Sequence, residues 1–210
     1  MKLFELGSVL SKQLDIREIA HRHIQKLVNK LNRTVHLAIY DHGKAIYVEK
    51  IEVPHTIQIS SQVGKLAPMY CTGVGKSILA YLDDEKIELI LTKNEFKKFT
   101  ENTLVDKEEI KQELKQIRKQ LYCMDNEEIE LDLKCIAAPI FNHKGEVIAG
   151  ISCSAPKMRI TDEKLPMMID NDNVRKCALH ISEALGLNVE ALKKYTSKEI
   201  YRMYITTPAD

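Results

Sequence analysis

The sequence predicts an α+β domain in which helices flank an antiparallel sheet of about six strands. Two observations lead to this prediction. Segments with the three- and four-residue apolar spacing of helices alternate with two groups of short segments whose apolar residues recur at every second position. Each group contains two strand-like segments joined by a glycine-containing turn, DHGK at 41–44 and NHKG at 142–145, as in a β-hairpin.

The first half of the chain predicts two helices followed by three strands. In order, these elements cover 3–10, 15–31, 34–41, 45–53 and 56–62. The second helix has apolar residues at helical steps, and Asp15 followed by Glu18 is typical of a helix start. In the first strand, Val35, Leu37 and Ile39 fall on one face, which we expect to be buried.

The second half predicts three helices, about three more strands and a final helix. In order, these elements cover 75–82, 84–91, 106–120, 121–124, 134–141, 146–154 and about 171–185. Asp106 and Glu109 supply the start signal of the helix at 106–120. Gly186 follows the last helix, at the position where a glycine commonly forms the C-terminal cap.

The composition excludes several classes of function. With 31 basic and 30 acidic residues the formal net charge is +1, so bulk electrostatics attract neither nucleic acid nor an anionic membrane. No apolar run approaches the roughly 18 residues of a membrane span, and the N-terminus lacks the pattern of a signal peptide. Five cysteines without a C-x-x-C pair indicate reduced thiols, and hence a cytoplasmic protein.

The second hairpin gives the clearest indication of a binding site. In EVIAGISCS (146–154) one face carries apolar residues suited to a core, whereas the other narrows to Gly150, Ser152 and Ser154. Protein interiors are close-packed, so such small side chains in mid-sheet leave volume for solvent or a ligand. This face is either the floor of a polar-lined pocket or an exposed sheet surface.

The stretch PMYCTGVGKS (68–77) resembles the end of a phosphate-binding loop, but the pattern G-x-x-x-x-G-K-[ST] is incomplete. The pattern requires glycine at position 70, where this chain has Tyr70. Two interpretations remain for Gly73 and Gly75. They either let an anion approach the backbone N–H groups at a helix start, or they allow the helix to pack closely on the sheet.

Four blocks of sequence together resemble the effector-binding domain of IclR-type bacterial transcription regulators. They are PMYCTGVGKSILA (68–80), DNEE (125–128), CIAAP (135–139) and GISCSAP (150–156). The spacing between them is close to that of the family, and the resemblance spans about residues 4–186. Cys71 and Ser77 depart from the family pattern, which usually has alanine at both positions. The resemblance implies a GAF-like domain that binds a small metabolite.

The resemblance also implies a division of the chain. Residues 1–14 correspond to the end of a linker helix, 15–186 to the effector-binding domain, and 187–210 to an extension. The extension is predicted to be helical from its apolar residues Leu187, Leu192, Ile200 and Met203. In the family, an N-terminal winged helix-turn-helix domain binds DNA. This chain lacks it, so we expect a C-terminal fragment that reaches DNA only through the missing domain, as a homodimer or homotetramer.

The pocket that the resemblance implies is lined by Gly73, Val74, Asp125, Cys135, Ser152 and Ser154. Apolar walls are expected from Ile57, Ile59 and Leu133. Backbone amides at 73–75 and the two serine hydroxyls would donate hydrogen bonds to a carboxylate, while an ionised Asp125 accepts one from a ligand hydroxyl. These groups favour a small carboxylate effector, such as a keto or sugar acid, and no cofactor.

Other roles remain open for several of these residues. Asp125 is also typical of a loop or a helix cap, and Cys135 of a small buried side chain. Cys71 or Cys135 as a nucleophile would make the protein an enzyme, but no histidine stands in a partner motif. Convergence of Cys71, Asp125, Cys135 and Cys153 on zinc would make it a metal-dependent sensor, but Cys153 alternates with Ser152 and Ser154 and should face away from the pocket. Ordinary surface or packing positions are expected for His36, His55 and His180.

Overall fold

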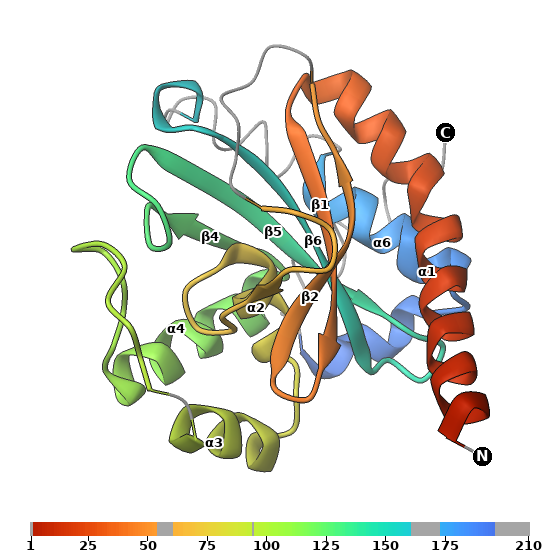
Figure 1. Ribbon diagram of the computed structural model, residues 1–210, viewed down its shortest axis with the longest axis horizontal. Helices are drawn as coiled ribbons and strands as arrows, with labels where there is room; N and C mark the ends of the chain where they lie inside the picture. The colour runs from red at the N-terminus through yellow and green to blue at the C-terminus, as the bar shows by residue number, and fades with distance from the viewer. Residues whose placement is uncertain (1, 54–60, 94, 161–172, 196–210) are drawn as a thin grey trace.

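The fold is built on a six-stranded antiparallel sheet, as the computed structural model shows for residues 2–53, 61–93, 95–160 and 173–195 (Figure 1). The strands are β1 (Thr34–Asp41), β2 (Lys44–Ile51), β3 (Leu66–Ala67), β4 (Cys123–Asn126), β5 (Leu133–Phe141) and β6 (Val147–Pro156). Their order across the sheet is β3-β2-β1-β6-β5-β4. The helices are α1 (Lys2–Leu31), α2 (Gly73–Leu79), α3 (Asp84–Lys93), α4 (Lys107–Gln120) and α6 (Val174–Ala184), with short 3-10 helices η1 (Lys157–Arg159) and η2 (Val189–Lys194). The predicted α+β class is confirmed.

Helices cover both faces of the sheet. α1 and α6 lie together on one face, and α2 with α3 and α4 lies on the other (Figure 1). Val35, Leu37 and Ile39 of β1 are buried in the same apolar cluster as α1 and α6, as their alternation predicts. The other face of the sheet contributes Ala38 and Ala137 to a second cluster, which α2 fills. In the described part of the chain, none of the helices has the length and apolar character that a membrane crossing needs.

Local signals at turns and helix ends are confirmed. β1 and β2 pair around Gly43, and β5 and β6 around Gly145. Both glycines have a positive φ, 86° and 71°, which glycine adopts without a steric penalty. Asp106 caps α4, since its Oδ1 accepts hydrogen bonds from two backbone N–H groups of the first turn at 2.9 and 3.0 Å. Gly186 follows α6 in the left-handed region, with a φ of 87°.

Several element boundaries differ from the prediction by two or three residues, and two differences are larger. α1 is one helix from Lys2 to Leu31, so the helix start predicted at Asp15 is wrong. An aspartate followed three residues later by a glutamate marks a start only where the preceding residues break the helix, and no glycine or proline stands between Leu10 and Asp15. The strand predicted at 56–62 falls largely on 54–60, outside the described residues, and β2 pairs instead with β3.

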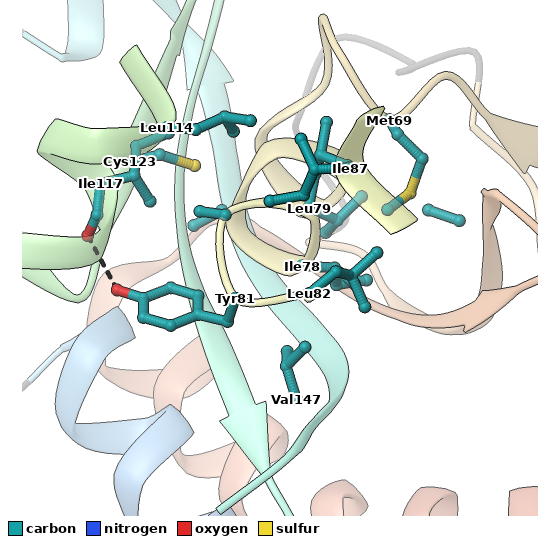
Figure 2. Packing of buried hydrophobic residues seen from close by; sticks show 14 of the residues in the cluster. Met69, Ile78, Leu79, Tyr81, Leu82, Ile87, Leu114, Ile117, Cys123 and Val147 are labelled. Carbon is teal, nitrogen blue, oxygen red and sulfur yellow. Dashed lines mark hydrogen bonds between the residues drawn. The ribbon is translucent and has the colours of Figure 1, made fainter. Parts of the chain in front are cut away.

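Helix α2 is buried along its whole length between the sheet and α4 (Figure 2). Figure 2 shows Ile78 and Leu79 of α2 within a dense apolar cluster to which Leu114 of α4 belongs. The Tyr81 hydroxyl, just after α2, donates to the carbonyl oxygen of Ile117 at 2.8 Å and so ties the end of α2 to α4 (Figure 2). These contacts hold α2 between the sheet and α4.

The described part of the C-terminal extension packs back onto the domain. Leu187 and Leu192 are buried in the cluster that surrounds α2. Val189–Lys194 forms a short 3-10 helix, which is tighter than the α-helix that the apolar spacing predicts. Ile200 and Met203 lie outside the described residues. The division of the chain into linker, effector-binding domain and extension stays a prediction.

Candidate functional site

A cavity of about 420 Å³ lies between the start of α2 and the sheet. Predicted site residues that line it together are Gly73, Val74, Asp125, Leu133, Cys135, Ser152 and Ser154. Ile57 and Ile59 lie outside the described residues. Gly150 lies on the same face of β6, two residues before Ser152. An added Cβ there would meet Ser77 Oγ at 2.5 Å, so α2 packs directly on the sheet at this point and the cavity ends. The serine face of β6 is therefore a cavity wall and not an exposed surface.

Strand register explains how distant residues reach this cavity. Directly opposed residues on neighbouring strands point to the same side of a sheet. Across β1, β6, β5 and β4, one such row is Thr34, Ser154, Cys135 and Asp125, and the next is His36, Ser152 and Ala137. Four strands thus contribute polar side chains to the cavity floor under α2, namely His36, Ser152, Ser154, Cys135 and Asp125.

The two glycines of the GVG stretch serve close packing. An added Cβ at Gly75 would lie 2.5 Å from the carbonyl oxygen of Pro68, and one at Gly73 would lie 3.2 Å from the Cβ of Ala137. Thr72 caps α2, since its Oγ1 accepts from the Gly75 amide at 3.1 Å and donates to the Pro68 carbonyl at 2.7 Å. The expectation that the Gly75 amide faces a ligand is therefore wrong. Thr72, Gly73 and Val74 border the cavity, whereas Gly75 is not among its lining residues.

The lysine of the GKS motif is a buried structural group. Lys76 has no solvent-exposed surface, and its Nζ forms an ion pair with Glu128, a second with Glu113 at 2.7 Å, and a hydrogen bond to the Met124 carbonyl at 3.0 Å. Burial opposes its charge, but the two carboxylates outweigh burial and raise the pKa of Lys76. Lys76 is not among the residues that line the cavity, and its ammonium is already paired with two carboxylates, so this stretch is not a phosphate-binding loop.

Asp125 lines the cavity and also holds a loop. It is 1% exposed and borders the cavity, while its Oδ1 accepts a hydrogen bond from the backbone N–H of Glu128 at 2.8 Å. Burial raises the pKa of Asp125 to about 6, against the opposing effect of that backbone hydrogen bond. One carboxyl oxygen thus holds the loop after β4, and the group can take up or release a proton near neutral pH.

The cysteines are poorly suited to nucleophilic or zinc chemistry. Cys135 Sγ lies 3.1 Å from Ser154 Oγ, and burial raises the pKa of the Cys135 thiol well above its ordinary value. Burial likewise raises the pKa of Cys71 to about 12. Both a nucleophile and a zinc ligand must be thiolates, which these environments disfavour. Within the described ranges, no three His, Cys, Asp or Glu side chains are grouped so that they could hold a metal ion.

His36 is a cavity residue that the sequence analysis assigned to surface or packing. It is 2% exposed, with Nε2 2.7 Å from Ser61 Oγ and Nδ1 3.4 Å from Ser154 Oγ. Burial, with a further contribution from the Lys50 charge, lowers the pKa of His36 to about 3, so its imidazole is neutral. Its place on β1, between the apolar positions Val35 and Leu37, was a usable signal for the cavity face.

Further lining groups come from loops and from β2, and the sequence pattern did not predict that they would reach the cavity. They include Tyr47, Ser61, Lys65, Phe99 and Glu130. The ring of Tyr47 lies against that of His36, with 5.4 Å between the ring centroids. His180, on α6, is half-buried on the opposite side of the sheet, and His55 lies outside the described residues. The cavity thus combines neutral polar groups and an aromatic edge with the ionisable side chains of Lys65, Asp125 and Glu130.

Known proteins with similar sequences and folds are bacterial transcriptional regulators. The family model described as "Bacterial transcriptional regulator IclR C-terminal" matches residues 8–183. The HTH-type transcriptional regulator KdgR of Escherichia coli is 37% identical over 165 residues, which cover 79% of this chain and 63% of that protein. The IclR structure from Thermotoga maritima has 36% identity and a TM-score of 0.79, covering 88% of this chain and 74% of that one.

A more distant structure shares the fold. It is an IclR homologue from Microbacterium hydrocarbonoxydans, solved in complex with 4-hydroxybenzoate, with 23% identity and a TM-score of 0.75. It covers 88% of this chain and 74% of that chain. The matches define the C-terminal domain of a class of bacterial transcriptional regulators, and the matched relatives are regulators and not enzymes. The chain belongs to the IclR family of transcriptional regulators, whose C-terminal domain it matches. It spans just under two thirds of the length of the E. coli relative.

Proposed function

We propose that the cavity binds a small carboxylate metabolite, such as a keto or sugar acid, and that this binding alters DNA binding by an N-terminal winged helix-turn-helix domain. The observation that carries the proposal is the division of polar groups around the cavity. Hydroxyl groups of Ser152 and Ser154 lie on its floor, and the carboxyl group of Asp125 stands on β4, two strands away. Such an arrangement suits a ligand with an acid at one end and a hydroxyl donor at the other.

The size and lining of the cavity support a small ligand. About 420 Å³ lies at the lower end of the range for small-molecule sites, which is roughly 300–1,000 Å³. Leu133, Ile129 and Phe99 supply apolar wall area beside the polar floor. The complex of the Microbacterium homologue with 4-hydroxybenzoate supports the carboxylate class for this chain as well.

Transmission to DNA would use the long first helix. α1 extends from Lys2 to Leu31 and leads directly into β1, which carries His36 on the cavity floor. A ligand changes the equilibrium between two arrangements only if it binds one of them better. We therefore propose that occupancy of the cavity favours one orientation of α1 in a cytoplasmic homodimer or homotetramer, which the DNA-binding domain then follows.

A thermal-melt screen tests the effector class. The panel contains pyruvate, glyoxylate, 2-keto-3-deoxygluconate and 4-hydroxybenzoate. A ligand at about 100 times its Kd stabilises by roughly 2.7 kcal/mol, which raises the melting temperature of a domain of this size by about 5–10 °C. Ser152→Ala and Asp125→Ala should each abolish the shift.

Ser182→Ala is the matched control. Ser182 is a buried serine on α6 that accepts from the Phe141 amide at 3.0 Å, away from the cavity. Its loss should lower the melting temperature and leave the ligand-induced shift unchanged. If no acid on the panel raises the melting temperature, or if Ser152→Ala retains the full shift, the carboxylate assignment fails.

A further inference from the structure

A line of four side chains crosses the cavity floor from a loop to β5. Ser61 Oγ lies 2.7 Å from His36 Nε2, His36 Nδ1 lies 3.4 Å from Ser154 Oγ, and Ser154 Oγ lies 3.1 Å from Cys135 Sγ. All four side chains are at least nine-tenths buried, and all four line the cavity. A neutral imidazole has one donor and one acceptor nitrogen, so the direction of the hydrogen bond between His36 and Ser61 determines the direction of the one between His36 and Ser154.

The two tautomers of His36 give the cavity opposite polarity. If Nε2 carries the proton, Nδ1 accepts from the Ser154 hydroxyl, and Ser154 then offers the cavity only a lone pair. If Nδ1 carries the proton, it donates to Ser154 Oγ, and the protonated Cys135 thiol can fill the second lone pair. The Ser154 hydroxyl proton then has only the cavity to point into. The first arrangement suits a ligand donor, and the second suits an acceptor such as a carboxylate.

The geometry around Nε2 favours the proton on Nδ1. The 2.7 Å contact between Ser61 Oγ and His36 Nε2 is short enough for a hydrogen bond in either direction. The Lys50 ammonium favours Ser61 as the donor, since its Nζ donates to the Ser61 carbonyl oxygen at 2.8 Å and so lies at the Nε2 end of the imidazole. Its counterion, Glu52, has a half-exposed side chain. A cation at that end of the imidazole favours a lone pair there and an N–H at the far end.

We propose that His36 is a positioning residue that sets the polarity of the effector site. The Ser61 hydroxyl donates to Nε2, Nδ1–H donates to Ser154 Oγ, and the Ser154 hydroxyl proton is directed into the cavity. The site therefore selects an anionic acceptor over an uncharged analogue of the same shape. This inference rests on the proposed function for the class of ligand, but the tautomer itself is a property of the ligand-free protein.

Nitrogen NMR of protein labelled in its histidine rings measures the tautomer directly. The His36 resonances are assigned through their proximity to the Tyr47 ring. We expect the proton on Nδ1 and none on Nε2 at about pH 7 in the absence of ligand. A proton on Nε2, or a doubly protonated ring, overturns the proposal. In Ser61→Ala the preference for Nδ1 should weaken, whereas Ser61→Thr, which keeps the hydroxyl, should retain it.

Calorimetric titration then measures the selectivity with two matched pairs, 4-hydroxybenzoate with 4-hydroxybenzamide and pyruvate with pyruvamide. For whichever acid binds, Ser61→Ala should weaken the acid by about 10-fold and change the affinity for its amide little. Ser61→Thr should restore the affinity for the acid. If Ser61→Ala weakens the binding of acid and amide equally, or weakens neither, the proposed role of the Ser61–His36–Ser154 hydrogen bonds is overturned. If neither acid binds the unaltered protein, the proposed function fails while the NMR result still decides the tautomer.

Discussion

Replacing the buried lysine of α2 is the strongest test of how the roof of the cavity is held. The side chain of Lys76 is fully buried, and its Nζ is paired with carboxylates from two separate elements. Lys76→Met keeps an unbranched side chain of similar length and removes the charge. Glu128, whose side chain is only 7% exposed, is left without its partner cation. Glu113 also loses its partner cation, but its side chain is 27% exposed, so water solvates its charge better than that of Glu128.

The expected magnitude follows from that difference in burial. Breaking a buried ion pair by removing one partner costs about 3–5 kcal/mol, because an uncompensated charge remains in the interior. For a domain of this size, each kcal/mol lowers the melting temperature by about 2–4 °C, so the total fall should be about 6–20 °C. Adding Glu128→Gln to Lys76→Met removes the unpaired charge and should recover part of the loss.

Urea denaturation and thermal melts of three variants carry out the test. The surface control is Lys111→Met, which removes pairs with Glu88 and Glu108, both more than half exposed, and should cost less than about 1 kcal/mol. Suppose Lys76→Met is as stable as Lys111→Met and the unaltered protein binds a nucleoside triphosphate that Lys76→Met does not. The structural role of Lys76 would then be refuted in favour of a phosphate-binding one.

Three further predictions concern the cavity and its roof. Gly75→Ala should cost about 3 kcal/mol in urea denaturation, because its Cβ meets the Pro68 carbonyl; a normal midpoint would contradict this packing. Since burial raises the pKa of Asp125 from 3.8 to about 6, the folded protein holds a proton that the unfolded chain releases, and stability falls as pH rises through that window. Asp125→Asn should remove up to about 3 kcal/mol of this pH dependence, measured as the unfolding free energy at several pH values. An unchanged pH profile in this variant would exclude Asp125 as its source. All five buried cysteines should react slowly with iodoacetamide in the native protein; one fast thiol would indicate a thiolate.

Local patterns were sufficient wherever a feature depends on neighbours in sequence. The alternation in β6 predicted correctly that Ser152 and Ser154 share a face opposite to Ile151, because strand periodicity needs only adjacent residues. The same holds for the cap at Asp106 and the glycine turns. The start signal at Asp15 failed because a local pattern does not reveal whether the preceding turn is already helical.

Tertiary structure decided which of these faces meet and which polar groups are already satisfied. The amide of Gly75 is taken by Thr72, and the ammonium of Lys76 by acids that lie 37 and 52 residues further along the chain. No sequence period encodes pairs at such separations. Their positions depend on how α4 and the loop after β4 pack against α2.

By itself, the sequence determined most helices and strands, the turns, the family and seven of the lining groups, because each depends on short-range periodicity or on motifs that resemble those of a known family. Only the tertiary structure decided that His36 belongs to the site. His36 and Ser154 stand 118 residues apart and become neighbours because β1 pairs with β6 in one particular register. A shift of that register by one residue would turn His36 to the opposite face of the sheet, among α1 and α6. The polarity of the cavity is therefore set by the strand pairing that the whole domain stabilises.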